Sequence, residues 1–161
     1  MSITARLNEL GIELPAVATP IGAYQPATKE RHFVITSGQL PLVNGELTLT
    51  GKVGAEVDTD QAKAAARVCA LNALAAGANA AGGLDNLTRV VEITGFVASD
   101  PNFTAQPEVL NGASELFGEI FANSEGHARS AVGVAVLPLN SPVEVSVVFA
   151  VKGGCRHNHN H

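Results

Sequence analysis

The sequence predicts one domain in which two helices pack against a β-sheet. The chain has 161 residues, which is the usual size of a single domain. Apolar residues recur with helical spacing in two stretches, residues 58–81 and 107–122. Several other stretches are rich in β-branched residues, as strands are. We expect the domain to span residues 1–152 and to be followed by a flexible, histidine-rich tail at residues 153–161.

The N-terminal third carries one helix signal and several strand signals. Apolar side chains among polar ones in residues 2–14 predict a short amphipathic helix that ends near Gly11, with extended chain after it. Residues 32–37 predict a strand that ends at Gly38. Asn44-Gly45 has short apolar stretches on both sides and predicts a tight turn, so we expect a small hairpin there.

The clearest single element is the helix at residues 58–81. Asp58 can cap its N-terminus, Gln61 can complete a capping box, and Gly82-Gly83 ends the helix. Its apolar face is nearly all alanine, which lets a helix lie close to a sheet.

The rest of the chain predicts three strands and the second helix. Residues 88–99 form a strand, a turn at residues 100–102 leads to the helix at 107–122, and strands at 130–137 and 143–151 close the fold. The last strand is largely apolar on both faces. Two helices cannot easily cover both faces of a sheet, so a partner subunit is the economical cover.

Composition excludes several classes of function. Only 16% of residues are charged, against about 25% in ordinary soluble domains. The net charge of −5 and an aromatic content of 4% argue against nucleic acid as the main partner. No stretch is long and apolar enough to cross a membrane, and the N-terminus lacks the pattern of a signal peptide. Cys69 and Cys155 do not form a disulfide framework, so we expect a cytoplasmic protein.

The sequence holds no strong metal-site or nucleophile motif. Walker, Cys-x-x-Cys, His-Glu-x-x-His and Gly-x-Ser-x-Gly patterns are all absent. His32 stands alone in the sequence, and we expect it to be structural or exposed to solvent. The alternating histidines of residues 155–161 could bind a transition metal weakly, but we favour a disordered tail or a purification remnant as their explanation.

Two charges stand out because they lie in apolar strands. Arg129 opens one strand and Glu144 lies early in the next. Strand spacing makes direct pairing within one chain doubtful by about 20 Å, so each charge needs water, a ligand or a neighbouring subunit. A planar guanidinium suits a substrate carboxylate, and a carboxylate in a partly apolar pocket suits activation of water. The alternative is that both form ion pairs at an interface.

Several segments also match a known family in order and spacing. The chain resembles the RidA family, the YjgF-like reactive-intermediate deaminases also called L-PSP endoribonucleases, over residues 20–151, and in particular its longer branch. The segments that carry the resemblance are Ile21-Gly22-Ala23-Tyr24, Ile35-Thr36-Ser37-Gly38-Gln39-Leu40-Pro41, Ala128-Arg129-Ser130, Leu137-Pro138 and Val143-Glu144-Val145, with Asn111 and Glu115 in the second helix.

The resemblance implies a chorismate-mutase-like α+β fold, with a mixed sheet of about six strands and two helices on one face. It implies a homotrimer with three clefts between subunits. Arg129 would hold the carboxylate of a 2-imino or 2-enamino acid, and Glu144 would help water to add and expel ammonia, without a metal or organic cofactor. The residues expected to bind substrate are Tyr24, Ser37, Gly38, Asn111, Ala131 and His127.

Departures from the family pattern leave the activity open. Deaminating members often carry cysteine at the position of Ala131, so a thiol contribution is lost while a backbone role survives. His127 puts an imidazole beside the expected cleft, where it either assists proton transfer or simply faces solvent. The main hypothesis is hydrolytic deamination. The alternative is a non-catalytic trimer that binds small carboxylates, and an endoribonuclease fits the composition less well.

Overall fold

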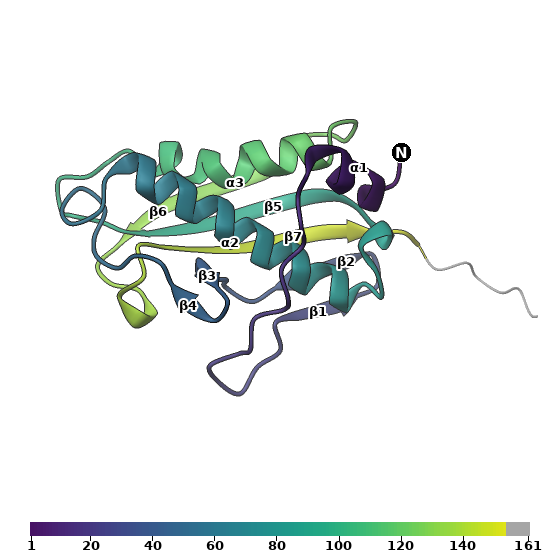
Figure 1. The fold of residues 1–161 in the computed structure, drawn as a ribbon, viewed down its shortest axis with the longest axis horizontal. Coiled ribbons are helices and arrows are strands. Elements are labelled where there is room, and N and C mark those ends of the chain that lie inside the picture. Colours follow the sequence, from purple (N-terminus) through teal and green to yellow (C-terminus); the bar gives the residue numbers. More distant parts are fainter. Residues whose placement is uncertain (154–161) are drawn as a thin grey trace, which may run out of the picture.

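The computed structural model describes residues 1–153 and has an α+β architecture, as the sequence predicts. A five-stranded mixed sheet has the strand order β1-β2-β7-β5-β6, and helices α2 and α3 lie on one of its faces (Figure 1). Apart from Gly153, the predicted histidine-rich tail lies outside the described residues, so its expected flexibility and metal binding stay predictions.

Four of the five strands pair in antiparallel fashion, and β5 and β6 are parallel. The expected sheet of about six strands is five strands plus a separate hairpin, β3–β4, which turns at Asn44 and Gly45 with φ of 52° and 81°. The strands are β1 (Ala27–Glu30), β2 (Phe33–Thr36), β3 (Leu42–Val43), β4 (Glu46–Leu47), β5 (Leu87–Ala98), β6 (Ala128–Val134) and β7 (Val143–Val151).

Strand β1 is the one strand that the sequence analysis does not predict. It is a short edge strand of mainly exposed residues, and it pairs only with β2. It lacks the apolar alternation that marks a half-buried strand, because edge strands bury little of their surface.

The strand order also separates two strands that are consecutive in the chain. Strands β6 and β7 follow each other in the sequence but are not neighbours in the sheet, since β5 lies between them.

Helix α2 (Thr59–Ala80) begins as its sequence predicts. The Gln61 backbone N–H donates to Asp58 at 2.8 Å and the Asp58 N–H donates to the Gln61 side chain at 3.0 Å, which completes the capping box. Its small residues allow close packing on the sheet. A Cβ atom added at Gly77 would lie 2.7 Å from the ring of Phe149 in β7.

Helix α3 (Gln106–Ile120) packs mainly against α2 and also contacts β5. Gly95 of β5 leaves room for Leu110, and Gly112 of α3 lies against the backbone carbonyl of Lys63 in α2. A side chain at either glycine would clash with its neighbour. These contacts fix α3 above the β5–β6 edge of the sheet, next to Arg129.

Helix α1 (Ile3–Leu10) is anchored far from its own place in the sequence. Thr4 donates to Asp85 through its backbone N–H at 2.9 Å and its hydroxyl at 3.0 Å, and Arg6 Nε donates to the Glu119 carbonyl of α3 at 2.8 Å. The helix ends at Gly11 with φ of 68°, as predicted. Residues 11–26 then cross α2 and reach the far side of the molecule (Figure 1).

The sheet face opposite α2 and α3 is covered by no other element of residues 1–153. Phe33, Ile35 and Val132 on this face are 43–45% exposed, although each is apolar. In β7, the residues facing the helices are buried and those between them are half-buried. The open face of β7 carries Val148 and Ala150 beside the polar Glu144 and Ser146. Together with Phe33, Ile35 and Val132, it is suited to burial against another protein surface.

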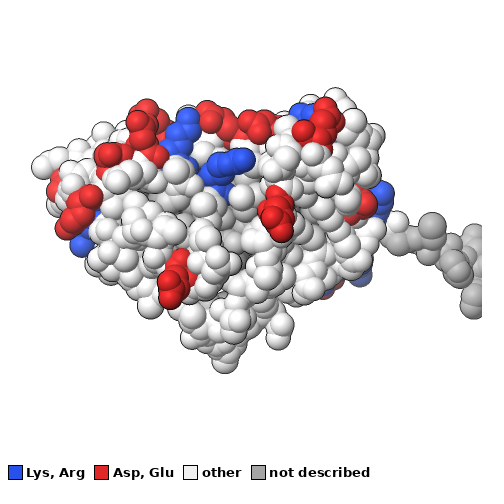
Figure 2. Space-filling model, in the orientation of Figure 1, with Lys and Arg blue, Asp and Glu red and all other residues white. Residues whose placement is uncertain are grey.

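Charge is unevenly distributed over the helix face. Acidic and basic side chains gather over α2 and α3, whereas the part formed by residues 11–26 and the β3–β4 hairpin is nearly uncharged (Figure 2). Residues 14–28 contain no Asp, Glu, Lys or Arg at all.

Candidate functional site

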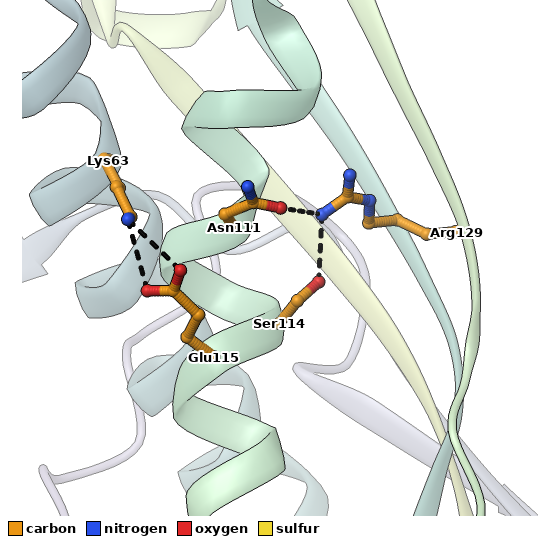
Figure 3. A network of polar contacts seen from close by, with 5 residues as sticks. All are labelled: Lys63, Asn111, Ser114, Glu115 and Arg129. Carbon is orange, nitrogen blue, oxygen red and sulfur yellow. Dashed lines mark hydrogen bonds and ion pairs between the residues drawn. The ribbon is translucent and has the colours of Figure 1, made fainter.

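Arg129 reaches from edge strand β6 to helix α3. Its Nη1 donates to Asn111 Oδ1 at 2.8 Å and to Ser114 Oγ at 3.0 Å (Figure 3). Asn111 and Ser114 are three residues apart, so they lie on one face of the helix. Both acceptors are uncharged, and they orient the guanidinium without neutralising it.

The nearest acidic residue on this part of α3 is engaged elsewhere. Glu115 pairs with Lys63 of α2, with both of its oxygens 3.2 Å from Nζ (Figure 3). Within residues 1–153, no carboxylate lies within 4.0 Å of the Arg129 guanidinium. Arg129 is half-buried, and its charge has no acidic partner among residues 1–153.

Glu144 lies on central strand β7, in an apolar setting. Its carboxyl group folds over the backbone of Gly38, where an added Cβ atom would lie 2.7 Å from the carboxyl carbon. Burial raises the pKa of Glu144, because an apolar environment disfavours the charged form. Gly38 is thus needed for close approach, and the carboxylate is poised as a stronger base than an exposed one.

The backbone on both sides of Glu144 is fixed. The Val143 carbonyl accepts bonds from the Ser141 hydroxyl at 2.9 Å and the Cys69 thiol at 3.8 Å. Val145 exchanges two backbone bonds with Gln39, at 2.8 and 3.0 Å. Burial raises the pKa of Cys69, and the nearby Glu144 charge adds to the effect, so the thiol is kept neutral.

A small hollow of about 90 Å³ opens beside Glu144. Tyr24, 46% exposed, lies on one wall and Gly38 on another. Apolar residues supply most of the remaining wall. They are Ala18, Pro20, Ile21, Pro26, Leu40, Leu42 and Pro138.

Ser37, which we expect to lie close to substrate, directs its hydroxyl at the chain itself. Its hydroxyl donates to the Gln25 carbonyl at 2.5 Å and its backbone N–H donates to the Pro26 carbonyl at 2.8 Å. These two bonds hold the end of the loop that carries Tyr24. The contribution of Ser37 in this structure is therefore to position that loop beside Gly38.

The other expected residues lie on the Arg129 side. Asn111 contacts Arg129, and Ala131 is two residues further along β6, on the same face. His127 is half-buried at the start of β6, and its Nδ1 lies 3.1 Å from the Ala128 carbonyl. Because a carbonyl only accepts, this contact places a proton on Nδ1 and leaves Nε2 as the free nitrogen in neutral histidine.

Arg129 and Glu144 do not meet within one chain. Arg129 pairs with Ile93, which is buried beneath the helices, whereas Glu144 pairs with Phe96, on the opposite face of β5. The two residues are two strands apart, about 10 Å across the sheet, and about 10 Å apart along it. Arg129 and Glu144 therefore do not pair directly within one chain, as the sequence analysis expects. The reason is the intervening strand β5, and not the register of two adjacent strands.

Sequence reasoning missed Ser114 and the apolar wall of the hollow. Ser114 cannot be recognised as a site residue from the sequence, because it accepts a hydrogen bond from Arg129, which lies 15 residues away on another element. The wall comes from three separate segments that only the fold brings together.

The remaining features show no second site of this kind. Residues 1–153 contain no cluster of three or more His, Cys, Asp or Glu side chains that could hold a metal ion. A larger hollow of about 480 Å³ lies beside α1 and the C-terminal end of α3, but none of the candidate site residues lines it. Over the same residues, no helix combines the length and apolar composition needed to cross a bilayer.

The sheet order and the two helices on one face define a protein of the chorismate mutase-like α+β class. We call the groups around Arg129 and around Glu144 its two half-sites. Residues 4–151 match the family described as "YjgF/chorismate_mutase-like, putative endoribonuclease". The match covers nearly the whole chain, so the chain belongs to the YjgF/RidA family, as its motifs predict.

Individual relatives agree with this assignment. Protein TCP17 of Trypanosoma cruzi is 42% identical over 91% of this chain and 92% of its own length. The structure of Atu1372 from Agrobacterium tumefaciens, a protein of unknown function, is 41% identical, covers 94% of both chains and has a TM-score of 0.84. Escherichia coli TdcF, solved with bound serine, is 26% identical, with 88% and 96% coverage and a TM-score of 0.59.

Proposed function

We propose that this protein hydrolyses reactive 2-imino and 2-enamino acids to 2-oxo acids and ammonia, in clefts between copies of a homotrimer. The observation that carries the proposal is the half-buried Arg129, whose protein partners are neutral and whose charge is uncompensated within residues 1–153. TdcF of the same family was solved with serine, a small molecule with a carboxylate.

Arg129 binds the substrate carboxylate in this proposal. A guanidinium presents parallel N–H groups that match the two oxygens of a carboxylate. Asn111 holds the guanidinium in place. Ala131 lies on the same face of β6 as Arg129, and His127 directly precedes the strand. Binding through the carboxylate leaves the C2 carbon of the substrate free to face the second half of the site.

Glu144 activates the water molecule. The ionised carboxylate takes a proton from water as the water oxygen bonds to C2 of the protonated imine, which gives a neutral tetrahedral carbinolamine. The protonated carboxyl group returns this proton to the nitrogen, and the C–N bond breaks so that ammonia leaves with the bonding electrons. The hydroxyl oxygen forms the C=O double bond of the 2-oxo acid, and its proton passes to the carboxylate and from there to solvent. An enamine first becomes the imine by taking a proton at C3. The raised pKa of Glu144 suits both the uptake and the return of the proton.

The separation of the two half-sites supports assembly. Arg129 and Glu144 lie on opposite faces of one sheet, so one chain cannot place both against a small acid. A second copy that covers the exposed apolar face can bring its own half-site to the first. We propose a homotrimer, which completes three equivalent clefts, and we expect it to act in the cytoplasm on acids released by other enzymes.

The direct test generates 2-aminoacrylate in the presence of the purified protein and measures ammonia and pyruvate. The wild-type protein is expected to accelerate pyruvate formation, and Arg129→Ala is expected to abolish the acceleration. Failure of the wild-type protein with both this enamine and the 2-imino acid of leucine would refute the deaminase proposal.

One observation favours the second candidate, a non-catalytic protein that binds small carboxylates. Ala131 occupies the position where deaminating members often carry cysteine. In that case, 2-oxobutyrate raises the melting temperature through Arg129 while no turnover occurs. Turnover by the wild-type protein decides between the two candidates. An endoribonuclease is less favoured, because the net charge is −5.

A further inference from the structure

The hydrogen bonds of Arg129 leave only part of its guanidinium available. A guanidinium has five N–H groups, of which two belong to Nη1. Nη1 donates to both Asn111 and Ser114, at 2.8 and 3.0 Å. No residue of the described chain accepts a hydrogen bond from Nη2 or Nε. Figure 3 shows Nη1 directed at α3, and no dashed contact reaches either of the other two guanidinium nitrogens.

This pattern selects one edge of the guanidinium for a carboxylate. A bidentate carboxylate needs two parallel N–H groups, which are found on the Nη1–Nη2 edge or on the Nε–Nη2 edge. Two acceptors on Nη1 occupy the first edge. The Nε–Nη2 edge remains, and it faces away from α3.

Two further features make Ser114 suited to this task. Its hydroxyl is neutral, so it orients Arg129 without cancelling the positive charge, as an aspartate in its place would. It also lies on a helix that cannot easily move, because Gly112 contacts the Lys63 backbone and Gly95 contacts Leu110. Asn111 alone would leave the guanidinium free to rotate about a single hydrogen bond.

We propose that Ser114 is a positioning residue, which together with Asn111 directs a substrate carboxylate to the Nε–Nη2 edge of Arg129. The inference rests on the proposed carboxylate-binding role of Arg129. It is independent of whether bound substrate is turned over.

The test compares Ser114→Thr with Ser114→Val in the full-length protein. Both side chains are β-branched and have nearly the same shape, so they disturb the helix equally, but only threonine keeps the hydroxyl acceptor. Calorimetric titration with 2-oxobutyrate gives the affinity for the carboxylate. The neutral amide 2-oxobutyramide serves as the matched ligand that does not need the guanidinium.

Ser114→Thr is expected to bind 2-oxobutyrate within about 2-fold of wild type, and Ser114→Val about 10-fold more weakly, since a hydrogen bond to a charged group is lost. The amide should bind both variants equally. Equal 2-oxobutyrate affinity in the two variants, or an equal loss of both ligands in Ser114→Val, would overturn the proposal.

The same titration separates this inference from the proposed reaction. If the wild-type protein binds 2-oxobutyrate and the two variants differ as expected, absence of ammonia release refutes deamination but supports the role of Ser114. The opposite outcome is a wild-type protein that does not bind 2-oxobutyrate and an Arg129→Ala protein that no longer assembles. In that case the Nε–Nη2 edge of Arg129 pairs with a carboxylate of another subunit, and the role of Ser114 toward a ligand is refuted.

Discussion

The two halves of the candidate site, around Arg129 and around Glu144, differ in their electrostatic environment. Arg129 lies on an edge strand, where neutral side chains of α3 orient it and leave its charge unmatched. Glu144 lies on a central strand in apolar surroundings, where burial raises its pKa. The first half is suited to hold an anion and the second to exchange a proton. In the proposed mechanism the chain thus separates binding from chemistry, and each half can be perturbed alone.

The largest expected effect comes from neutralising the proton-transfer half. Glu144→Gln should lower kcat about 100-fold or more, because a general base is lost, while binding of 2-oxobutyrate through Arg129 persists. Single-turnover rates and calorimetry measure the two separately. The substitution should also raise the melting temperature slightly, since it removes a half-buried charge. Parallel loss of binding and turnover would mean that the two halves are not separate.

A smaller effect is expected when the Glu144 side chain is displaced but kept. A Cβ atom at Gly38 would lie 2.7 Å from both the carboxyl carbon and Oε2 of Glu144, so Gly38→Ala should move the carboxylate and lower kcat about 10-fold. The moving group is the end of a flexible side chain, so the melting temperature should change little. Gly118→Ala is the matched control, because nothing lies within 4 Å of its added Cβ. Unchanged kcat in Gly38→Ala would contradict this placement of Glu144.

The pH dependence of kcat/KM should report on the ionisation of Glu144 and not on Arg129. Glu144 acts as a base when ionised, so kcat/KM should rise with pH through its pKa, at a value above that of an ordinary glutamate. The free energy of unfolding should change with pH in the opposite direction. The folded chain holds this proton more tightly than the unfolded chain, so the Glu144 contribution to stability falls as pH rises through the same window. A kcat/KM profile without an acidic limb above the usual glutamate range would remove Glu144 from the chemistry.

The smallest effect is expected at the anchor of α1, which lies outside both halves. Two Thr4 hydrogen bonds lower the pKa of Asp85, so its stabilising contribution is present above the unfolded pKa and is lost as pH falls through the folded pKa. Asp85→Asn should lower the melting temperature by about 2–4 °C at neutral pH and leave kcat unchanged. A thermal melt with parallel kinetics checks this, and a large fall in kcat would show that α1 supports the site.

Sequence predicts the fold well where local signals are strong. The capping box at Asp58 and Gln61 and the turn at Asn44-Gly45 appear as expected, because the interactions that define them are local. Strand β1 and the insertion of β5 between β6 and β7 were not predictable, since an exposed edge strand has no apolar alternation and strand order is a tertiary property.

The candidate site shows the same division. Arg129 and Glu144 stand out in the sequence because each is a charge in an apolar strand. Their placement on opposite faces depends on the pairing of each with β5, which the sequence leaves open. Ser114 could be found only from the fold, because its role depends on the approach of a side chain from another element.

The most direct test of a site shared between copies is complementation. Arg129→Ala and Glu144→Gln proteins are each inactive in this account, but when unfolded, mixed in equal amounts and refolded together they can form interfaces with one intact Arg129 and one intact Glu144. Random mixing should restore about a quarter of the wild-type activity. Recovery near that level, with none in either variant refolded alone, is the predicted result. Mixed trimers that form and remain inactive would contradict a site built from two chains.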